Sequence, residues 1–413
     1  MIAKNHIQVF EYQLLQCGDV FKRKHLAALS KLNALNNDCY FDLRYNGVKF
    51  KNFVGVLQVE NLTIEILPKV DTQEDNTALW QGVLIDMLKT TKKLNISKVG
   101  KANVSKQNLH LLDIYFQWFL DEVEVLIHQG LIKQYYRKTG NVKALKGKLE
   151  FAGHLRKNLV HKERFYTTHQ VYEKDHLIHQ VLAYALSVIE KFSKGTYVYS
   201  RCKSIQLNFP EVSKINIDSR SFTRIKLNRK SAPYKTALEI ARFIILQYAP
   251  NIKHGQENMI ALLFDMNSLW EEFIYISLKR HLPEKYTIHA QNTKKFWKPN
   301  DGYNSNMRPD IVINKGMQDC IVCDTKWKNI SKSNPVPNDL RQLYVYHDYY
   351  SAQKVALIYP GNSSFLSSGF YYEKYGEKLS NKECGVISIQ VNRNIKKWQF
   401  DIAQEIDNWI KNS

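Results

Sequence analysis

The sequence predicts a multidomain α+β protein with a mixed β and helical N-terminal region and a C-terminal domain of the α/β/α type. The length of 413 residues corresponds to about two or three ordinary domains. Apolar residues make up 44% and aromatic residues 12% of the chain, which suffices for sizeable cores and excludes a largely disordered protein. After residue 257 the segments are ordered helix, three strands, helix and strand, which is typical of a mixed sheet with helices on its faces. We therefore expect a boundary between residues 1–257 and residues 258–413.

The N-terminal region alternates between strand-like and helix-like segments. Strand signals cover residues 7–10 and 53–70, and the second segment alternates around an expected turn at Glu60-Asn61. Apolar residues at helical spacing predict one helix over about residues 78–94 and a longer one over about residues 109–136. The remaining elements are short strands over 138–151 with turns at Gly140 and Gly147, helices over about 177–193 and 236–248, and a polar linker over 250–258.

The C-terminal domain has a clearer order. The apolar segment 260–264 precedes a helix over 267–281, whose apolar residues form one broad face. The later elements are strands at about 286–291, 308–314 and 319–326, a helix over 338–351, strands at 354–359 and 385–391, and a final helix over 396–411. This alternation supports a sheet that is covered by helices on both faces.

The net charge indicates a polyanionic partner. The chain carries 59 Lys and Arg against 39 Asp and Glu, a net charge of +20. A surplus of this size fits nucleic acid or an acidic membrane face. Residues 258–413 hold 20 basic and 16 acidic residues, so only +4 of the surplus lies there and +16 lies in residues 1–257. We therefore do not expect the C-terminal domain alone to contact the polyanion.

The sequence also predicts a cytoplasmic protein without a membrane span. No uninterrupted apolar run approaches about 18 residues, and residues 1–15 lack the charged and apolar regions of a signal peptide. Six cysteines are too few for a disulfide scaffold and favour a reducing compartment. Cys320 and Cys323 form one C-x-x-C without a second pair at zinc-binding spacing, and we expect them to be a buried structural pair in a strand.

Two carboxylates and an ammonium group form the strongest candidate site. Asp310 opens one predicted strand and Asp324 closes the next, so adjacent antiparallel strands would bring the carboxylates together. Side chains alternate along a strand, so Asp324 and Lys326 share one face. Carboxylate oxygens are the ligands that Mg²⁺ prefers, with Mn²⁺ as a substitute, and such a metal activates water and neutralises phosphoryl charge. Asp310 and Asp324 are expected to bind the metal, and Lys326 to position the water or stabilise negative charge.

A plainer alternative treats these three residues as strand-end charges at a hairpin, but their surroundings favour the site. Glu271 lies on the preceding helix beside Trp270. Gln342 and Tyr346 are four residues apart and share one face of the following helix. Pro309 stands where a strand begins, a place that tolerates proline. The order of a helical Glu, Pro-Asp, Asp-x-Lys and Q-x-x-x-Y resembles the PD-(D/E)xK nuclease superfamily, which implies that Glu271 and Gln342 belong to the catalytic group.

A more specific resemblance covers almost the whole chain. The residues that carry it are 10–12 (FEY), 64–70 (IEILPKV), 145–149 (LKGKL), 154–158 (HLRKN), 164–166 (RFY), 264–267 (FDMN), 269–271 (LWE) and 307–310 (MRPD). This series resembles the McrC subunit of McrBC-type, 5-methylcytosine-specific restriction systems, with Trp270 where that family usually has Phe. The resemblance implies that residues 1–257 dock on a hexameric McrB-like AAA+ GTPase and stimulate it. It also implies that residues 258–413 are a Mg²⁺-dependent PD-(D/E)xK endonuclease domain that cleaves double-stranded DNA, as in a type IV restriction enzyme.

The absence of one motif agrees with this resemblance. The sequence contains no G-x-x-x-x-G-K-[ST] loop, so it has no phosphate-binding loop with which to hydrolyse a nucleotide itself. A motor would have to act in trans. Two other classes of function remain as alternatives: an interaction module that only stimulates the partner, and a stand-alone DNA repair nuclease. The DNA sequence or modification that is recognised stays open.

Two basic clusters are candidates for contacts with DNA, and each has a plainer alternative. The candidates are Arg156, Lys157, Lys162 and Arg164 in the first cluster and Lys294, Lys295 and Lys298 in the second, with Tyr346 added from the helix that follows the site. Residues of the first kind more often form a solvated basic face, whereas the second cluster could equally be an exposed loop. The second lies between two strands of the C-terminal domain, where lysines could grip phosphate near the cut. The aromatic residues 115, 116, 118 and 119 are expected to lie in a core or partner interface.

Overall fold

The computed structural model describes residues 5–69, 76–91, 93, 111–249, 259–328, 330 and 334–411. By their contacts, the residues form two compact units. Unit 1 comprises residues 1–4, 58–61 and 96–262, and unit 2 comprises residues 5–57, 62–95 and 263–413. The N-terminal strands thus share a unit with the C-terminal domain, a grouping that differs from the functional division expected at residue 258. The expected linker over 250–258 lies outside the described residues.

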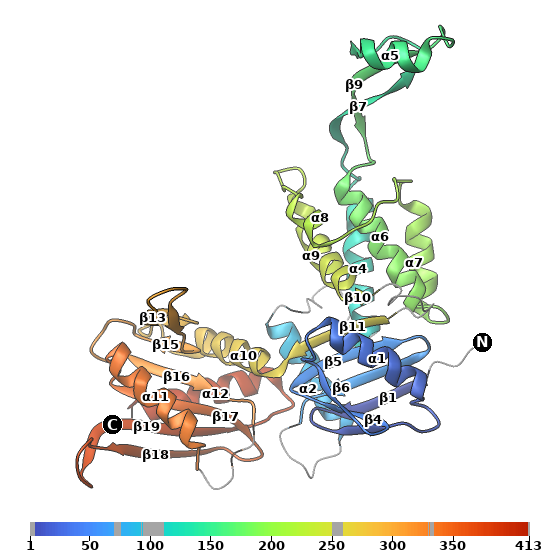
Figure 1. Ribbon diagram of the computed structural model, residues 1–413. Coiled ribbons are helices and arrows are strands. Elements are labelled where there is room, and N and C mark those ends of the chain that lie inside the picture. The colour runs from blue at the N-terminus through green and yellow to red at the C-terminus, as the bar shows by residue number, and fades with distance from the viewer. Residues whose placement is uncertain are drawn as a thin grey trace. The chain divides into compact units, whose positions relative to one another are not determined.

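The N-terminal part of unit 2 contains strands in both parallel and antiparallel pairs (Figure 1). Strand β1 (Asn5–Phe10) pairs in parallel with β6 (Leu62–Leu67), whose other neighbour is β5 (Phe53–Val59). Glu60 follows β5 with a positive φ of 49°, so the turn predicted at Glu60-Asn61 is confirmed. The other elements here are β2 (Leu14–Gln16), α1 (Arg23–Leu35), β3 (Phe41–Arg44), β4 (Gly47–Phe50) and α2 (Thr77–Thr90). Helix α2 was expected, whereas α1 was not.

The C-terminal part of unit 2 is a mixed six-stranded sheet with the order β12-β15-β16-β17-β19-β18. Its strands are β12 (Ile288–Ala290), β15 (Ile311–Ile313), β16 (Ile321–Thr325), β17 (Lys354–Gly361), β18 (Phe365–Tyr372) and β19 (Leu379–Gln390). Strands β16, β17 and β19 run parallel, and the outer pairs are antiparallel. Hairpin β13 (Lys294–Trp297) and β14 (Ser305–Met307) forms a separate two-stranded sheet. The expected mixed sheet is confirmed.

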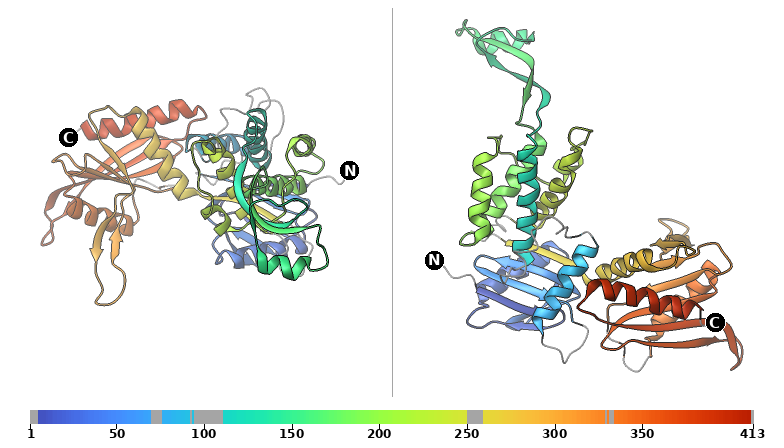
Figure 2. Two further views of the ribbon diagram at one scale, coloured as in Figure 1. Left: turned by 90° about the horizontal axis from the view of Figure 1, so that it is seen from above. Right: turned by 180° about the vertical axis from the view of Figure 1, so that it is seen from behind.

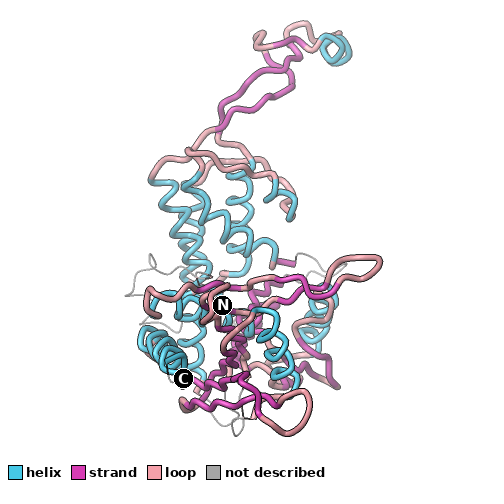
Figure 3. Tube along the Cα trace, turned by 90° about the vertical axis from the view of Figure 1, so that its left-hand side faces the viewer, coloured by secondary structure: helices cyan, strands magenta, loops and turns pink. Residues whose placement is uncertain are grey.

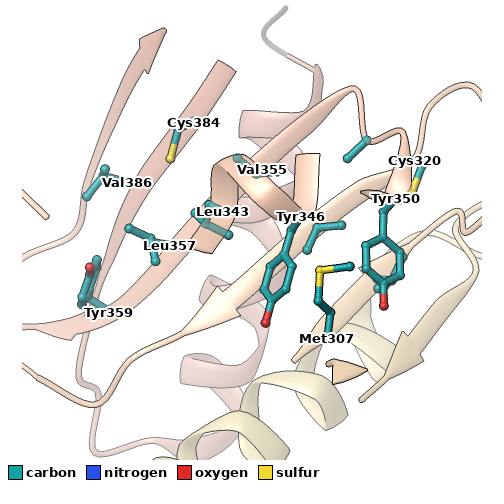
Figure 4. Packing of buried hydrophobic residues seen from close by; sticks show 13 residues of the cluster. Met307, Cys320, Leu343, Tyr346, Tyr350, Val355, Leu357, Tyr359, Cys384 and Val386 are labelled. Carbon is teal, nitrogen blue, oxygen red and sulfur yellow. The ribbon is translucent and has the colours of Figure 1, made fainter. Parts of the chain in front are cut away.

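Helices cover both faces of this sheet. Helix α11 (Pro337–Tyr350) packs on one face against β16, β17 and β19, while α10 (Met266–His281) and α12 (Ile395–Lys411) pack on each other and on the opposite face (Figures 1 and 2). Alternate residues of β17, Val355, Leu357 and Tyr359, form a core with Leu343 and Tyr346 of α11 (Figure 4). On the other face, Trp270 and Phe273 of α10 pack against Trp398 of α12 with ring centroids 5.6 and 4.8 Å apart.

The two cysteines of the C-x-x-C are both buried, as expected, and both are free thiols. Cys320 belongs to the core on the α11 side of the sheet. Cys323 lies three positions further along, on β16, so the alternation of a strand turns it to the opposite face. The two residues are therefore core residues that do not act as a pair.

Unit 1 contains a group of packed helices. Its helices are α4 (Leu111–His128), α6 (Leu177–Phe192), α7 (Tyr197–Asn208), α8 (Ser219–Thr223), the 3₁₀ turn η1 (Ala232–Tyr234) and α9 (Lys235–Leu246). Helix α4 packs on α7 and α9, and α6 packs on α7 and α9. Tyr115, Phe116 and Phe119 of α4 are buried, which confirms their expected place in a core. Short strand β10 (Tyr248–Ala249) pairs with the start of β11 (Met259–Asp265).

A slender arm extends from one end of these helices (Figures 1 and 3). It consists of β7 (Gln134–Val142), β8 (Lys148–Leu149), α5 (Phe151–Asn158) and β9 (Phe165–Glu173), in the sheet order β7-β9-β8. The helix predicted to reach residue 136 ends at His128 because Gly130, at a φ of 85°, breaks it, and residues 134–136 belong to β7. Gly140 lies within β7 and is not a turn, whereas Gly147, at a φ of 65°, is in a turn as expected.

Among the described residues, no helix is both long enough and apolar enough to cross a membrane.

Candidate active site

Two neighbouring antiparallel strands place the predicted carboxylates at one end of the sheet. Ile311 of β15 lies opposite Cys323 of β16, so Asp310, just before β15, and Asp324 come to the same edge. This arrangement follows from the strand alternation that predicted it. Asp324 is only 2% exposed, and Asp310 is partly buried. The site is thus built on the most regular part of the domain, where backbone pairing fixes its side chains.

Backbone and hydroxyl donors fix the carboxylate of Asp310. Its Oδ2 accepts hydrogen bonds from the backbone N–H of Thr325, at 2.7 Å, and from the Thr325 hydroxyl, at 2.9 Å. Burial raises the pKa of Asp310, and the two bonds from Thr325 oppose that rise. Thr325 was not among the predicted residues, although its place between Asp324 and Lys326 puts it at the same strand end.

Asp324 and Lys326 form an ion pair that Gln342 completes. Lys326 Nζ lies 2.6 Å from Asp324 Oδ2. The amide of Gln342 donates to Asp324 Oδ1 at 3.3 Å and to the hydroxyl of Tyr346 at 2.8 Å, and its oxygen accepts from Lys326 Nζ at 3.4 Å. Gln342 and Tyr346 were predicted to share one face of α11, and that face is directed toward this site.

Burial and the neighbouring charges shift the pKa values of these side chains in opposing directions. Burial, followed by the charge of Asp310, raises the pKa of Asp324 to about 6, and Lys326 acts against both effects. Burial lowers the pKa of Lys326, but the neighbouring carboxylates outweigh it and raise the pKa above its ordinary value. Lys326 is therefore a cation beside two carboxylates that repel each other.

Glu271 approaches the same edge from α10. Its Oε1 accepts a hydrogen bond from Gln291 Nε2 at 2.9 Å, and the backbone N–H of Gln291 donates to the carbonyl oxygen of Asp310 at 2.8 Å. Burial, and then the charge of Asp310, raises the pKa of Glu271. Gln291, which has a positive φ of 49°, thus links Glu271 to Asp310. It follows a short strand in a loop, and no motif marked it in the sequence.

A further acidic residue was also missed. Asp339, in the first turn of α11, pairs with Lys328 at 2.6 Å and accepts from the hydroxyl of Tyr359 at 3.3 Å. Its charge raises the pKa of both Asp324 and Lys326, so it belongs to the electrostatic surroundings of the site. An acid in the first turn of a helix is usually explained by the helix dipole, which is why the sequence alone gave it no role.

The donor set fits a magnesium ion. Asp310 and Asp324 offer carboxylate oxygens at one edge, and their mutual repulsion would be relieved by a bound cation. Within the described part of the chain there is no group of three or more His, Cys, Asp and Glu residues arranged to hold a metal. Mg²⁺ commonly binds through one or two carboxylates and retains several waters, so it suits this pair better than a metal that needs a full protein cage.

The lysines at residues 294–298 lie on and beside the hairpin β13–β14, which leads into Asp310. Lys294 donates to the carbonyl oxygen of Tyr349 and lies over the ring of Tyr350, 5.5 Å from its centroid. Lys294 therefore anchors the hairpin on the end of α11. Lys295 and Lys298 are both exposed, and Trp297 is 60% exposed. The hairpin was expected only as a loop.

The first basic cluster lies on the arm of unit 1, so it is not part of the group around Asp310 in unit 2. Arg156 and Lys157 are on α5, and Lys157 Nζ lies 4.3 Å from the ring centroid of Tyr166. Arg164 pairs with the exposed Glu163 at 3.2 Å. These contacts allow either of the roles considered from the sequence, a DNA contact or a solvated basic face.

Known proteins resemble this chain in sequence and in fold. A model of the McrBC 5-methylcytosine restriction system component family matches residues 48–360. The type IV methyl-directed restriction enzyme EcoKMcrBC of Escherichia coli K12 is 21% identical over 200 residues, which are 47% of this chain and 58% of that protein. The chain thus aligns with little more than half the length of this relative.

Two solved structures share the fold at 20% identity. One is a half-complex of Thermococcus gammatolerans McrB AAA+ hexamers with bound McrC, matched over 98% of this chain and 100% of that chain with a TM-score of 0.72. The other is the McrBC complex of the same organism, matched over 67% and 88% with a TM-score of 0.50. Because the family model covers well over half of the sequence, this chain belongs to the McrBC 5-methylcytosine restriction system component family.

Proposed function

We propose that this chain is the endonuclease subunit of a McrBC-type restriction complex and that it cleaves double-stranded DNA with Mg²⁺. The observation that carries the proposal is the meeting of Asp310, Asp324 and Lys326 at one buried sheet edge. The mixed sheet with helices on both faces, and Glu271 and Gln342 beside the carboxylates, support a PD-(D/E)xK nuclease domain. Membership of the family supports a role in restriction.

The proposed chemistry of cleavage follows from the side chains that would surround the scissile phosphate. A magnesium ion held by Asp310 and Asp324 would supply an activated water and neutralise phosphoryl charge. Thr325 keeps Asp310 in the orientation that faces Asp324. Lys326 presents a cation to the negative charge that develops on the phosphate. Gln342 orients Lys326 against Asp324, and Glu271 acts from the neighbouring helix on the water or on its ligands.

We further propose that a McrB-like AAA+ GTPase hexamer drives the cleavage and that residues 1–257 dock on it and stimulate it. The related complexes contain McrC bound to McrB AAA+ hexamers. These 413 residues contain no phosphate-binding loop, which supports a motor that acts in trans. Most of the basic surplus also lies in residues 1–257, which supports an approach of DNA that involves this region as well as the nuclease domain.

The test reconstitutes the chain with a McrB-like AAA+ GTPase and measures DNA cleavage and nucleotide hydrolysis in the same tubes with Mg²⁺. Wild type should cleave, and Asp324→Asn should not, while both stimulate hydrolysis. Asp319→Asn is the matched control, since Asp319 lies near the other end of the same two strands, bonded to Asn314. If Asp324→Asn cleaved DNA at the wild-type rate, the nuclease assignment would be wrong. The chain would then be an interaction module that only stimulates its partner.

A further inference from the structure

A buried carboxylate near the N-terminus contacts a tryptophan that follows β16, the strand that carries Asp324. Glu11 is only 4% exposed and lies 316 positions before Trp327 in the sequence. Its Oε1 accepts a hydrogen bond from the indole Nε1–H of Trp327 at 2.6 Å. Both residues belong to unit 2. Trp327 directly follows Lys326, so this bond is made one residue from the proposed catalytic lysine.

Glu11 is itself firmly held. It follows β1, and its backbone N–H donates to the carbonyl oxygen of Leu67 at 2.9 Å, which continues the pairing of β1 with β6. The same Oε1 also accepts the backbone N–H of Lys69 at 3.0 Å. One oxygen atom therefore joins three segments: the end of β1, the end of β6 and the residue after Lys326. A buried carboxylate is costly to keep without partners, and the two donors on Oε1 offset part of that cost.

Trp327 connects this oxygen to both sides of the active site. Its ring packs edge-on against Trp270 with centroids 5.3 Å apart, and Trp270 precedes Glu271 on α10. The carbonyl oxygen of Ile358 accepts from the backbone N–H of Lys326 at 3.0 Å and from the indole N–H of Trp270 at 3.4 Å. A displaced Trp327 ring would therefore disturb Lys326 along the backbone and Glu271 through the packed indole.

We propose that Glu11 is a positioning residue of the nuclease site, and that it holds Trp327 so that Lys326 and Glu271 keep their places. This inference rests on the proposed nuclease function for its role in catalysis, but the anchoring of the strand end by Glu11 can be measured separately. It also gives the Phe10-Glu11-Tyr12 segment a role in the nuclease, since Glu11 holds Trp327, which lies just after the end of β16.

The variants separate the hydrogen bond from the charge and from the size of the side chain. Glu11→Gln keeps an oxygen that accepts from Trp327 and Lys69, and should keep the wild-type kcat. Glu11→Leu and Trp327→Phe each remove the bond, and should lower kcat for DNA cleavage at least about tenfold with little change in KM, since small misplacements of catalytic groups are costly. The double variant should be no slower than the slower single variant, because both substitutions break one interaction.

Controls distinguish positioning from a general loss of stability. Glu65→Leu removes another buried carboxylate of the same sheet, bonded to Gln8 and Gln81, and should lower thermal stability without lowering kcat. All variants are assayed in the reconstituted complex, whose nucleotide hydrolysis should stay at the wild-type level. If Glu11→Leu does not fold, Trp327→Phe and the rescue in Glu11→Gln still carry the test.

Hydrogen exchange supplies a readout that does not depend on cleavage. The backbone N–H of Lys326 should exchange faster in Glu11→Leu and in Trp327→Phe than in wild type or Glu11→Gln. A wild-type complex that cuts no DNA, combined with this exchange pattern, would remove the nuclease function and leave the anchoring in place. Wild-type exchange and wild-type kcat in both Glu11→Leu and Trp327→Phe would overturn the inference.

Discussion

Lys326 depends on its neighbours for both its charge and its direction. Asp324 holds its ammonium at 2.6 Å, and the Gln342 oxygen lies 3.4 Å from the same group. The two contacts differ in kind, since one partner is an anion and the other a neutral amide. Loss of the anion removes a proposed metal ligand, whereas loss of the amide only frees the lysine to move.

A graded series of substitutions should reflect this difference. Asp310→Ala, Asp324→Ala and Lys326→Ala should each lower the cleavage rate by about 10²-fold or more, because each removes a charge that faces the reacting phosphate. Gln342→Ala and Glu271→Ala should be milder, at about tenfold, since these residues orient other groups. Cleavage rates in the reconstituted complex measure the series. An equal loss of nucleotide hydrolysis would show damage to the fold instead.

The stability of the protein should depend on pH through Glu11. Burial raises the pKa of Glu11 from an ordinary value of 4.5 to about 7, and the charge of Asp265 adds to the rise, while the bonds from Lys69 and Trp327 oppose it. The folded protein therefore holds this proton more tightly than the unfolded chain does. Stability contributed by the protonated group is present at low pH and is lost as the pH rises from about 4.5 to about 7.

Glu11→Gln should remove that dependence because an amide does not titrate. The variant should gain stability relative to wild type as the pH rises through this window, by about 1.4 kcal/mol for each unit of pKa difference at most. Denaturant unfolding of both proteins at several pH values gives the difference. A difference in free energy of unfolding that stays constant with pH would mean that Glu11 is not buried as the structure has it.

Strand alternation explains which site residues could be predicted from the sequence. Asp324 lies on β16, and Asp310 and Lys326 lie directly beside β15 and β16, where a period of two residues determines the faces of the side chains. Thr325 lies in the same segment, yet its bonds to Asp310 depend on the pairing of the strands. Glu11 could not be assigned, since its partner lies 316 positions away and no local pattern records that contact.

At the scale of elements, those with a continuous apolar face were the most predictable, although α1 was missed while its Ala28, Leu29 and Leu32 are buried. Strand β17 and helix α10 carry continuous apolar faces, and their positions agree with the sequence within a few residues. Hairpin β13–β14 was missed because every residue of β13 is exposed, so its strand shows no alternation between apolar and polar residues. Helix α5 was missed because it spans only eight residues, which is too short for apolar residues at helical spacing to stand out in the sequence.

The hairpin β13–β14 should contribute charge to DNA binding. Lys295 lies on β13 and Lys298 directly follows that strand, and their neighbour Trp297 is exposed. Replacing both lysines by Ala should weaken binding of the isolated chain to double-stranded DNA at low salt. It should also make the dependence of affinity on salt shallower, by about one unit of slope for each lost phosphate contact.

Lysines elsewhere provide the control for the hairpin. Lys279 and Lys285 lie over the rings of Tyr275 and Tyr286 in the same domain, so Lys279→Ala combined with Lys285→Ala removes an equal charge without touching the hairpin. Binding is measured over a range of salt concentrations, with little sequence preference expected because these contacts reach phosphates and not bases. An unchanged slope in the hairpin variant would show that its lysines are a solvated edge.

At the scale of the whole molecule, the two compact units suggest two separable tasks. Unit 2 holds the catalytic group, whereas unit 1 holds the helices and the arm. The arm exposes several large apolar side chains, and the exposure of such a group to water is unfavourable. These residues and their exposed fractions are Phe151 (70%), Leu155 (57%), Leu159 (72%) and Val160 (84%). An apolar patch of this kind, rimmed by basic residues, is typical of a surface that binds another protein.

If this arm docks on the AAA+ partner, substitutions in it should separate stimulation from the chemistry of the nuclease site. Leu155→Asp combined with Leu159→Asp places two charges on one face of α5 and at its end, and should abolish both co-purification with the partner and stimulation of its nucleotide hydrolysis. Leu207→Asp, at an 87% exposed residue of α7 in the same unit, is the matched control and should do neither. Asp324→Asn should show the opposite pattern, with full stimulation and no cleavage. If the double Leu variant still stimulates nucleotide hydrolysis, the docking surface lies elsewhere in residues 1–257. The apolar residues of the arm would then serve another purpose.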